Sequence, residues 1–500
     1  MLRAPRPSLF AFASLFALAS AACSTTVVTA DPPPGEPPPR TDPPVTTPTC
    51  SSDACPGDQS CRDGVCSDPT DRQKAQAAAV ATMADALAES SAWHRPVDLE
   101  AVKKKSRAMI MKGDGSDQPY FAAAWFTLNQ YPQGHQGLYA NDKAICGKAL
   151  PRQQSSRFGV CGRPSKGGLA VTLATPGNKL GLAVGDVVVS AGADSGDAIY
   201  EASFTRPTCG NTFPAASGRR YAGAASFFAN VPSGTKLTVR SPSGATREVT
   251  VPSEADAKVT DCTDPFGRSR AIYAEANVRP DGVAVIRLPS FFPYDKAFPT
   301  TQAEIDALIA AYQAEVVKVF ESVKSAPGIV WDARGNTGGI TSVGLAIVSG
   351  FPSAKATSIS YCRARTPGTT PIAYDRFRYA EYAITPGGPF AYTGKVAVVT
   401  DGLAYSAGDY FPFAALKGSS APVVGSATAG AYGASGATID VDGPPKLVTN
   451  FDPNGCFDAA TNANLEASPP APTLAVEYEP ADLAAGKDTV LEAAVKSLGL

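Results

Sequence analysis

The spacing of apolar residues changes along the chain, and each spacing predicts a different kind of element. Residues 71–89 are rich in alanine and place their larger apolar side chains on one helical face. A second helix is expected over Tyr120–Leu128, where a run of aromatic and small residues ends before a turn. The section 71–150 is therefore expected to be helical.

The pattern becomes strand-like after residue 165. Residues 178–190 read as a turn that leads into a strand, and residues 226–241 read as a short helix, a glycine turn and an alternating strand. Residues 247–252 continue with a further strand. The segment 165–255 is expected to form a small β-domain.

From residue 270 to the C-terminus, strands alternate with helices. Buried strands are expected at 283–288, 328–332 and 395–400, and Thr301 and Glu304 form a capping box before a long amphipathic helix. Alternating strands and helices predict an α/β core with functional loops at the carboxyl ends of the strands.

Length and composition limit the class of protein. Five hundred residues predict two or three domains. The 44 Lys and Arg residues nearly balance the 46 Asp and Glu residues and form no basic block, so nucleic acid is not an expected partner. Since only His94 and His135 occur, a three-histidine zinc site is excluded.

The N-terminus has the features of a targeting signal. Two arginines precede the apolar run 9–22, which ends at Cys23 and is too short to span a bilayer. Residues 1–22 resemble a bacterial lipoprotein signal peptide, which would leave Cys23 lipidated and the protein on the outer membrane of the cell envelope. Ordinary cleavage and secretion is the alternative. Of the eleven cysteines, ten remain once Cys23 carries a lipid, and an even number suits disulfides in an oxidising compartment.

Two small segments separate this signal from the helical section. Residues 23–49 are rich in proline and predict an extended tether. Residues 50–67 contain four cysteines, which fit either a zinc site or two disulfides, and the spacing and oxidising compartment favour a disulfide knot.

Candidate chemistry is concentrated in two loops that follow predicted strands. The first is 331–339, WDARGNTGG, and the second is 400–412, TDGLAYSAGDYFP. A serine on a tight strand-to-helix turn, such as Ser406, is held beside the free amides of the helix N-terminus, which suits a nucleophile with an oxyanion site. Ser406 as a simple helix N-cap is the alternative.

Taken together, these loops resemble those of the S41 family of serine peptidases, the tail-specific, C-terminal-processing and tricorn-core group. The matching segments are 330–339 (VWDARGNTGG), 406–412 (SAGDYFP), 423–430 (VVGSATAG) and the C-terminal helix 487–498. The turn 180–186 (LGLAVGD) resembles that of a PDZ domain. The resemblance implies a ClpP/crotonase-like α/β core with an inserted PDZ-like β-domain and an N-terminal helical section.

The catalytic base departs from part of this family. Processing peptidases use a lysine in the segment after VVG, but no lysine lies between Lys417 and Lys446, and Ala431 stands near the expected place. The tricorn-like branch uses a histidine before the PDZ-like insert, and His135 occupies that place after Gly134. The resemblance also implies a supporting glutamate after the nucleophile.

Two glutamates, Glu466 and Glu477, are candidates for the acid that supports His135, and Glu466 is the preferred one. The resemblance implies a serine peptidase in which Ser406 attacks a peptide carbonyl and His135 takes its proton. The amides of Ala407 and of Gly338 or Gly339 would hold the oxyanion.

Asp332 and Arg334 are expected to brace the first loop, and no metal or organic cofactor is needed. An ordinary histidine base predicts activity that rises with pH through roughly 6–7. A peptide-binding protein with an inactive core is the alternative function.

The six remaining cysteines of the body are expected to pair as neighbours along the chain. The predicted disulfides are Cys146–Cys161, Cys209–Cys262 and Cys362–Cys456.

Overall fold

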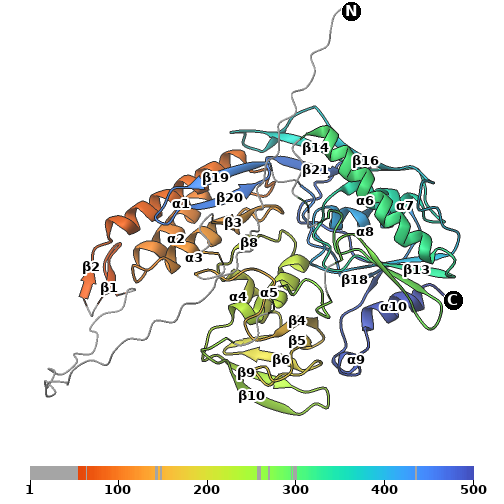
Figure 1. Ribbon diagram of the computed structural model, residues 1–500. Helices are drawn as coiled ribbons and strands as arrows, with labels where there is room; N and C mark the ends of the chain where they lie inside the picture. The colour runs from red at the N-terminus through yellow and green to blue at the C-terminus, as the bar shows by residue number, and fades with distance from the viewer. Residues whose placement is uncertain are drawn as a thin grey trace, which may run out of the picture.

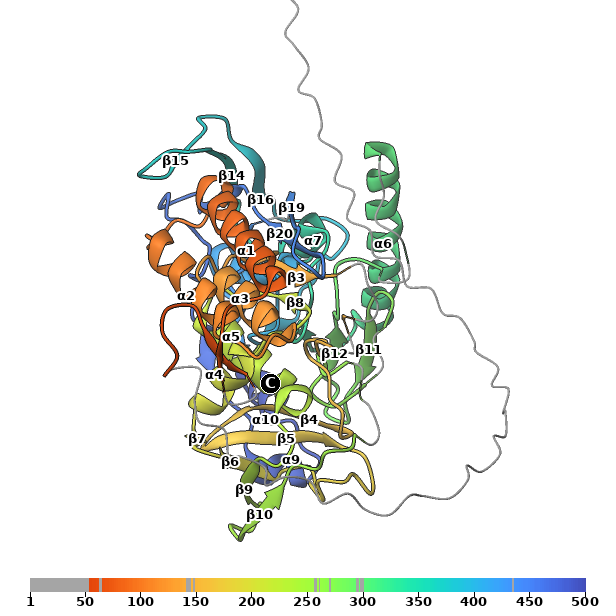
Figure 2. The same cartoon turned by 90° about the vertical axis from the view of Figure 1, so that its left-hand side faces the viewer.

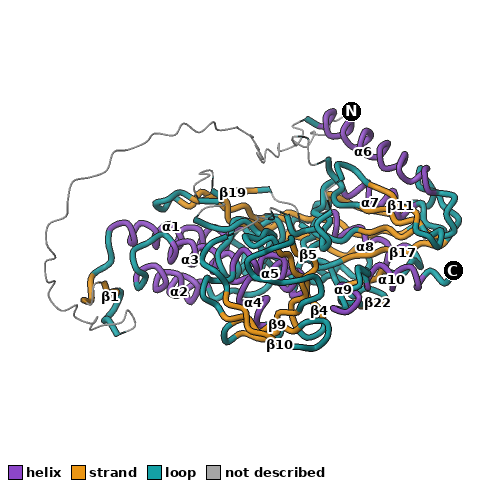
Figure 3. Tube along the Cα trace, turned by 60° about the horizontal axis from the view of Figure 1, so that its bottom comes forward, coloured by secondary structure: helices purple, strands orange, loops and turns teal. Residues whose placement is uncertain are grey.

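The computed structural model places a helical section at one end of the molecule and a layered α/β core at the other (Figure 1, Figure 3). It describes residues 54–62, 65–140, 145–146, 149–255, 259, 261–268, 271–293, 296, 301–433 and 436–500. The predicted signal peptide, Cys23, the tether 23–49 and Cys50 of the knot lie outside the described residues. Within those ranges, no helix has the length and apolar character needed to cross a membrane.

The helical section follows a small disulfide-linked hairpin. Strands β1 (Ser60–Arg62) and β2 (Val65–Ser67) pair antiparallel, and a Cys55–Cys66 disulfide joins the segment before β1 to β2. Helices α1 (Asp71–Ser90), α2 (Leu99–Met111) and α3 (Gln118–Leu128) then pack on one another around a shared apolar core. The helices predicted at 71–89 and 120–128 are confirmed.

The inserted β-domain is a sheet in the order β10-β9-β6-β5-β4, with β7 paired to β6. Its hydrophobic core lies between this sheet and two helices, and includes Leu169, Val188 and Phe227. The elements are β4 (Val160–Ser165), β5 (Gly168–Ala174), β6 (Val187–Ala191), β7 (Asp194–Ser195), α4 (Ala198–Thr205), α5 (Ala216–Asn230), β9 (Lys236–Arg240) and β10 (Thr246–Thr250).

The core is a six-stranded sheet in the order β11-β12-β13-β17-β18-β22, antiparallel between β11 and β12 and parallel elsewhere. Its strands are β11 (Glu275–Val278), β12 (Ala284–Arg287), β13 (Gly328–Asp332), β17 (Lys395–Thr400), β18 (Val423–Gly425) and β22 (Leu474–Ala475).

Both faces of this sheet are covered by helices. Successive side chains of a strand point to opposite faces, so Trp331 packs into one apolar cluster and Val330 into another. Helices α6 (Gln302–Val323), α7 (Thr341–Ser349) and α8 (Ala407–Gly418) cover the first face, and α9 (Pro480–Ala484) and α10 (Thr489–Ser497) the second. The capping box of Thr301 and Glu304 is present at α6, and the predicted α/β class is confirmed.

Two four-stranded sheets connect the core to the rest of the chain. One has the order β15-β14-β16 with β21 on β14, and the other has the order β19-β20-β3-β8. Their strands are β3 (Gly137–Tyr139), β8 (Gly210–Asn211), β14 (Thr357–Thr366), β15 (Ala373–Tyr374), β16 (Tyr379–Ile384), β19 (Ala437–Val441), β20 (Leu447–Phe451) and β21 (Asn454–Asp458). The second sheet places β3 beside strands that lie about three hundred residues later in the chain.

The disulfides differ from the predicted pairing at two of three places. Cys362–Cys456 forms across β14 and β21 as predicted, but Cys146 pairs with Cys209 and Cys161 with Cys262. The pairs Cys146–Cys161 and Cys209–Cys262 were wrong because chain order does not determine which strands meet. Residue 259 bridges residue 156, which brings Cys262 to Cys161.

Candidate active site

Ser406 lies where β17 ends and α8 begins, at the carboxyl edge of the parallel sheet. Its backbone has φ 60° and ψ −121°, a conformation that residues other than glycine rarely adopt. Its side chain makes no capping hydrogen bond to the helix, although it occupies the N-cap position. The simple N-cap interpretation therefore does not explain why a serine stands in this strained turn.

The loop after β13 lies directly against Ser406, because β13 and β17 are neighbouring parallel strands. A methyl group at Gly338 would lie 2.5 Å from the Ser406 Cβ, so only glycine leaves room there. The N–H of Gly338 donates to Asn336 Oδ1 at 2.9 Å. Within the described ranges, the N–H groups of Ala407 and Gly339 have no protein acceptor, and these two are the candidate oxyanion donors.

Asp332 and Arg334 brace the first loop, as the sequence predicted. The Arg334 guanidinium donates to Asp332 at 2.6 Å and to Asp488 at 2.7 Å, and both Asp332 and Arg334 are buried. Burial acts to raise the pKa of Asp332, but the Arg334 charge outweighs it and the pKa is lowered. Asp401 ties the two loops together by accepting N–H groups from Gly335 and Leu403.

His135 lies in the turn between α3 and β3, and it too has a positive φ, 54°. Its backbone N–H donates to the hydroxyl of Tyr405, and the two rings meet edge to face with centroids 5.0 Å apart. The imidazole Nδ1 is enclosed and has no hydrogen-bond partner. Burial lowers the pKa of His135 to about 4, so the ring is neutral at pH 7 and able to accept a proton.

Two buried carboxylates hold the loop 430–433 between them. Asp409 accepts the N–H groups of Gly430 and Ala431 at 2.6 and 3.1 Å. Glu466 accepts those of the next two residues, 432 and 433, at 3.0 and 3.1 Å, with its Oε2 atom. Burial raises the pKa of Asp409 and of Glu466 to about 7.

Glu466 also reaches the histidine loop. Its Oε1 atom accepts the N–H of Gly134 at 2.5 Å, although the two residues are 332 positions apart. A chain of contacts thus runs from Asp409 on the nucleophile helix, through the loop 430–433 and Glu466, to the backbone beside His135. In the described part of the chain, no hydrogen bond joins the His135 imidazole to Ser406 or to Glu466.

The small residues Gly134 and Ala431 explain how this histidine approaches. A methyl group at Gly134 would overlap the Cβ of Ala431. The histidine loop and the loop that contains Ala431 are therefore in direct contact, with no room for a side chain at position 134.

Residues 282–442 match the model of peptidase family S41. The match covers about a third of the chain and supports a peptidase function.

Two solved structures share the fold. Mature CPAF complexed with lactacystin has 14% sequence identity and a TM-score of 0.60, and the match covers 86% of this chain and 98% of that chain. A second crystal structure of mature CPAF has 14% identity and a TM-score of 0.59, with coverage of 86% of this chain and 97% of that chain. No curated protein sequence matches this chain. At these identities the likeness establishes the fold alone.

The segment that matches the family model contains four of the six candidate site residues. Ser406, Ala407, Gly338 and Gly339 lie within 282–442, whereas His135 and Glu466 lie outside it. The structure nevertheless brings all six residues into one connected group.

Three residues of this candidate site were missed by sequence reasoning. The Tyr405 hydroxyl accepts the N–H of His135, Asn336 Oδ1 accepts the N–H of Gly338, and Asp409 accepts the N–H of Gly430. Each lies within three residues of a residue that the motifs identified, but their partners are distant in sequence. Glu477, the second candidate acid, forms an ion pair with Arg220 at 2.5 Å instead of contacting the histidine loop.

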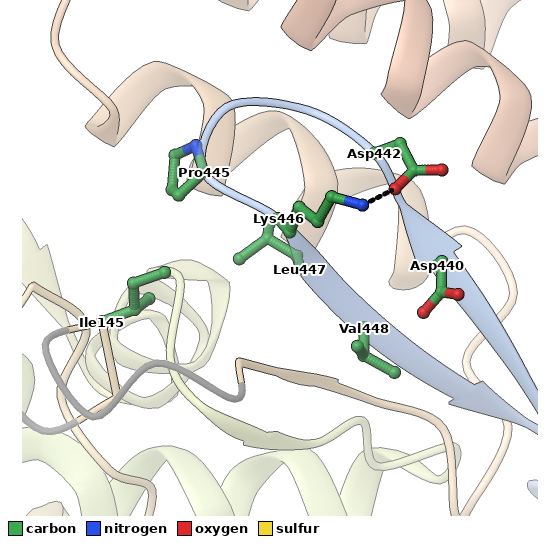
Figure 4. Close-up of a pocket in the computed structure, with 7 residues that line it drawn as sticks. All are labelled: Ile145, Asp440, Asp442, Pro445, Lys446, Leu447 and Val448. Atoms are coloured by element: carbon green, nitrogen blue, oxygen red, sulfur yellow. Dashed lines mark ion pairs between the residues drawn. The ribbon is translucent and has the colours of Figure 1, made fainter.

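Other features of the chain do not contribute to this group. His94 packs on Trp93, with ring centroids 5.2 Å apart. A pocket of about 370 Å³ lies at the β19–β20 hairpin, where Lys446 and Asp442 form an ion pair, and none of the predicted catalytic residues lines it (Figure 4). The described residues contain no cluster of three or more His, Cys, Asp or Glu side chains that could hold a metal ion.

Proposed function

We propose that this protein is a serine peptidase that cleaves polypeptides through an acyl-enzyme. Ser406 Oγ attacks the peptide carbonyl carbon while His135 takes the hydroxyl proton. The C–N bond then breaks, and His135 gives the proton to the leaving amine. Water, deprotonated by His135, attacks the ester and releases the acid product and Ser406.

The backbone supplies the oxyanion site in this mechanism. The amides of Ala407 and Gly339 are the donors that remain available beside Ser406, whereas that of Gly338 already serves Asn336. The dipole of α8, whose N-terminus begins at Ala407, favours negative charge at the same place.

Glu466 serves the histidine through the backbone rather than through the ring. Because it holds Gly134 by the N–H, it fixes the turn from which His135 extends. Tyr405 fixes the same turn from the nucleophile side. Glu466 and Tyr405 are therefore positioning residues in this proposal.

The observation that carries the proposal is that Ser406 has a strained backbone and makes no capping hydrogen bond, while the His135 ring packs on the ring of the adjacent Tyr405. Reaction with a fluorophosphonate probe tests it. Wild-type protein should be labelled, Ser406→Ala should not be, and Ser243→Ala, at an exposed turn of the β-domain, should be labelled as wild type.

A catalytically inactive peptide-binding protein is the second candidate. The lack of a hydrogen bond between the His135 imidazole and Ser406 favours it. Folded wild-type protein that resists the probe, and releases no fragments from labelled casein, would support this function instead.

We also propose that the protein is a lipoprotein of the bacterial cell envelope, anchored through Cys23, and that residues 165–255 form a PDZ-like domain. The signal-like segment 1–22 and the even number of remaining cysteines support the first proposal. The order of strands and helices in the β-domain supports the second. Labelling with radioactive palmitate and membrane fractionation test the anchor. Wild-type protein should incorporate palmitate and fractionate with membranes, and Cys23→Ala should do neither. Soluble, unlabelled wild-type protein would indicate secretion instead.

A further inference from the structure

Arginine and aromatic side chains gather on the sheet formed by β14, β15, β16 and β21. We define the arginine–aromatic surface by Arg363, Arg376, Phe377, Arg378 and Tyr379, with the buried Tyr361 ring beneath it. It lies at the periphery of the molecule, where β14 and β15 extend past the helical section (Figure 1, Figure 2).

Phe377 and Tyr379 are unusually exposed for aromatic residues. Phe377 is 68% exposed and stands between two exposed arginines, and Tyr379 is 36% exposed. An exposed phenylalanine has an unfavourable contact with water, which a partner that covers it would remove.

Two of the three arginines, Arg363 and Arg378, are held in place by stacking and not by carboxylates. The Arg378 guanidinium lies 3.8 Å from the centre of the Tyr361 ring, and that of Arg363 lies 5.1 Å from the same ring. Over the described ranges, no ion pair engages Arg363, Arg376 or Arg378, and the buried Nε of Arg363 has no acceptor. Stacked guanidinium groups keep their donors free for a carboxylate and lose little conformational freedom on binding.

The surface is also fixed to the rest of the protein. Arg365 donates to the carbonyl groups of Ala88 and Ser91 at the C-terminal end of α1, and Tyr382 packs on Tyr410 of α8 with centroids 5.1 Å apart. A segment bound to this surface would therefore be held at a constant position relative to the helix that begins beside Ser406.

We propose that the arginine–aromatic surface binds an acidic polypeptide segment that contains aromatic residues. Arginine and tyrosine are the residues enriched where protein partners bind, and the arginines match carboxylates in charge and geometry. Of the neighbouring carboxylates in the sequence, Asp375 accepts the backbone N–H of Phe377 and forms no ion pair with these arginines in the described part of the chain, so their donors are available to a partner.

Binding of a fluorescent random copolymer of glutamate and tyrosine tests the proposal. The full chain with Ser406→Ala is used, so that binding is measured whether or not the protein is a peptidase. The double variant Arg376→Ser, Arg378→Ser should weaken binding by about tenfold, and Phe377→Ser by a few-fold. Binding should also weaken as salt is raised.

A matched control removes the same charge elsewhere. The double variant Lys104→Ser, Arg152→Ser changes two exposed cations outside the surface and should leave the affinity within about twofold. Equal losses in both double variants, or equal binding of a lysine–tyrosine copolymer, would overturn the proposal.

A lipid surface is the competing occupant. The test uses vesicles of phosphatidylcholine and phosphatidylglycerol. The proposal is overturned if the protein sediments with these vesicles, loses this in Phe377→Ser, and does not bind the copolymer.

Discussion

The two sides of the candidate site are built in different ways. On the nucleophile side, Ser406 and Gly338 are placed by backbone, at the ends of two parallel strands that pair directly. On the histidine side, His135 is placed by side chains from distant segments, Tyr405 and Glu466, and by the close contact of Gly134 with Ala431. Backbone geometry tolerates little change, whereas a side-chain support can be removed or exchanged one atom at a time. Each side should therefore fail in its own way.

Removal of the histidine should have the largest effect. We expect His135→Ala to lower kcat/KM on fluorescent casein by about a thousandfold, because the proton acceptor is lost. Since burial lowers the pKa of His135 to about 4, wild-type kcat/KM should rise as the pH rises through about 4 and then level off. An ordinary histidine would place this rise at roughly 6–7.

His94→Ala is the control for this variant and should keep wild-type activity. Near-native activity of His135→Ala, in a protein that Ser406→Ala inactivates, would show that another group is the base. The double variant Ser406→Ala, His135→Ala should lose little more than either single variant.

Glycine substitutions should separate the two sides by whether they can be rescued. Gly338→Ala introduces a methyl group against Ser406 at φ 88°, so we expect about a hundredfold loss of activity that no neighbouring truncation restores. Gly134→Ala collides with both the Cβ and the backbone Cα of Ala431. The added change Ala431→Gly removes the nearer of these two contacts and should restore a small part of the activity.

The measurement is casein hydrolysis with circular dichroism as the check on folding. Rescue of Gly338→Ala by a second substitution, or no gain from Ala431→Gly, would contradict the distinction between a backbone-built and a side-chain-built side.

Glu466→Gln and Asp409→Asn compare the two buried carboxylates at constant shape. Glu466→Gln weakens the support of Gly134 and should lower kcat by about tenfold, with a smaller change in KM. Asp409→Asn should affect activity less, because Asp409 does not contact the histidine loop.

Both variants should change how stability depends on pH. Each wild-type carboxyl has a pKa raised to about 7, so each binds a proton more tightly in the folded chain than in the unfolded chain. Their contribution to stability is complete below the unfolded pKa of about 4 and is lost as the pH rises through about 7. The fall of Tm over this range should be shallower in either variant, and an unchanged slope would argue against the raised pKa values.

Tyr405→Phe should have the smallest effect. It keeps the ring that packs on His135 and removes the hydroxyl that accepts the His135 N–H. We expect a loss of several-fold in kcat, corresponding to one hydrogen bond of about 1 kcal/mol. A loss as large as that of His135→Ala would mean that the hydroxyl has a direct part in the chemistry.

Local sequence patterns predicted much of the fold and half of the site. The apolar run of β13, the capping box of α6 and the strand-to-helix turn at Ser406 depend on residues close together in the chain, and each was recognised. The functional assignments of Ser406, His135 and the amide donors stay predictions until the variants are measured. Asn336 and Asp409 were missed because their roles depend on which amide lies within reach.

The sequence by itself determined the α/β class, the central strands of the core, the capped helix α6 and the two loops that meet at Ser406, because periodicity, turns and caps act over a few residues. The tertiary structure alone decided the pairing of Cys161 with Cys262, the placement of β3 against β20, and the contact between Glu466 and Gly134. These contacts join residues between about one hundred and more than three hundred positions apart. They follow from how sheets and helices pack in three dimensions, and no local preference along the chain encodes them.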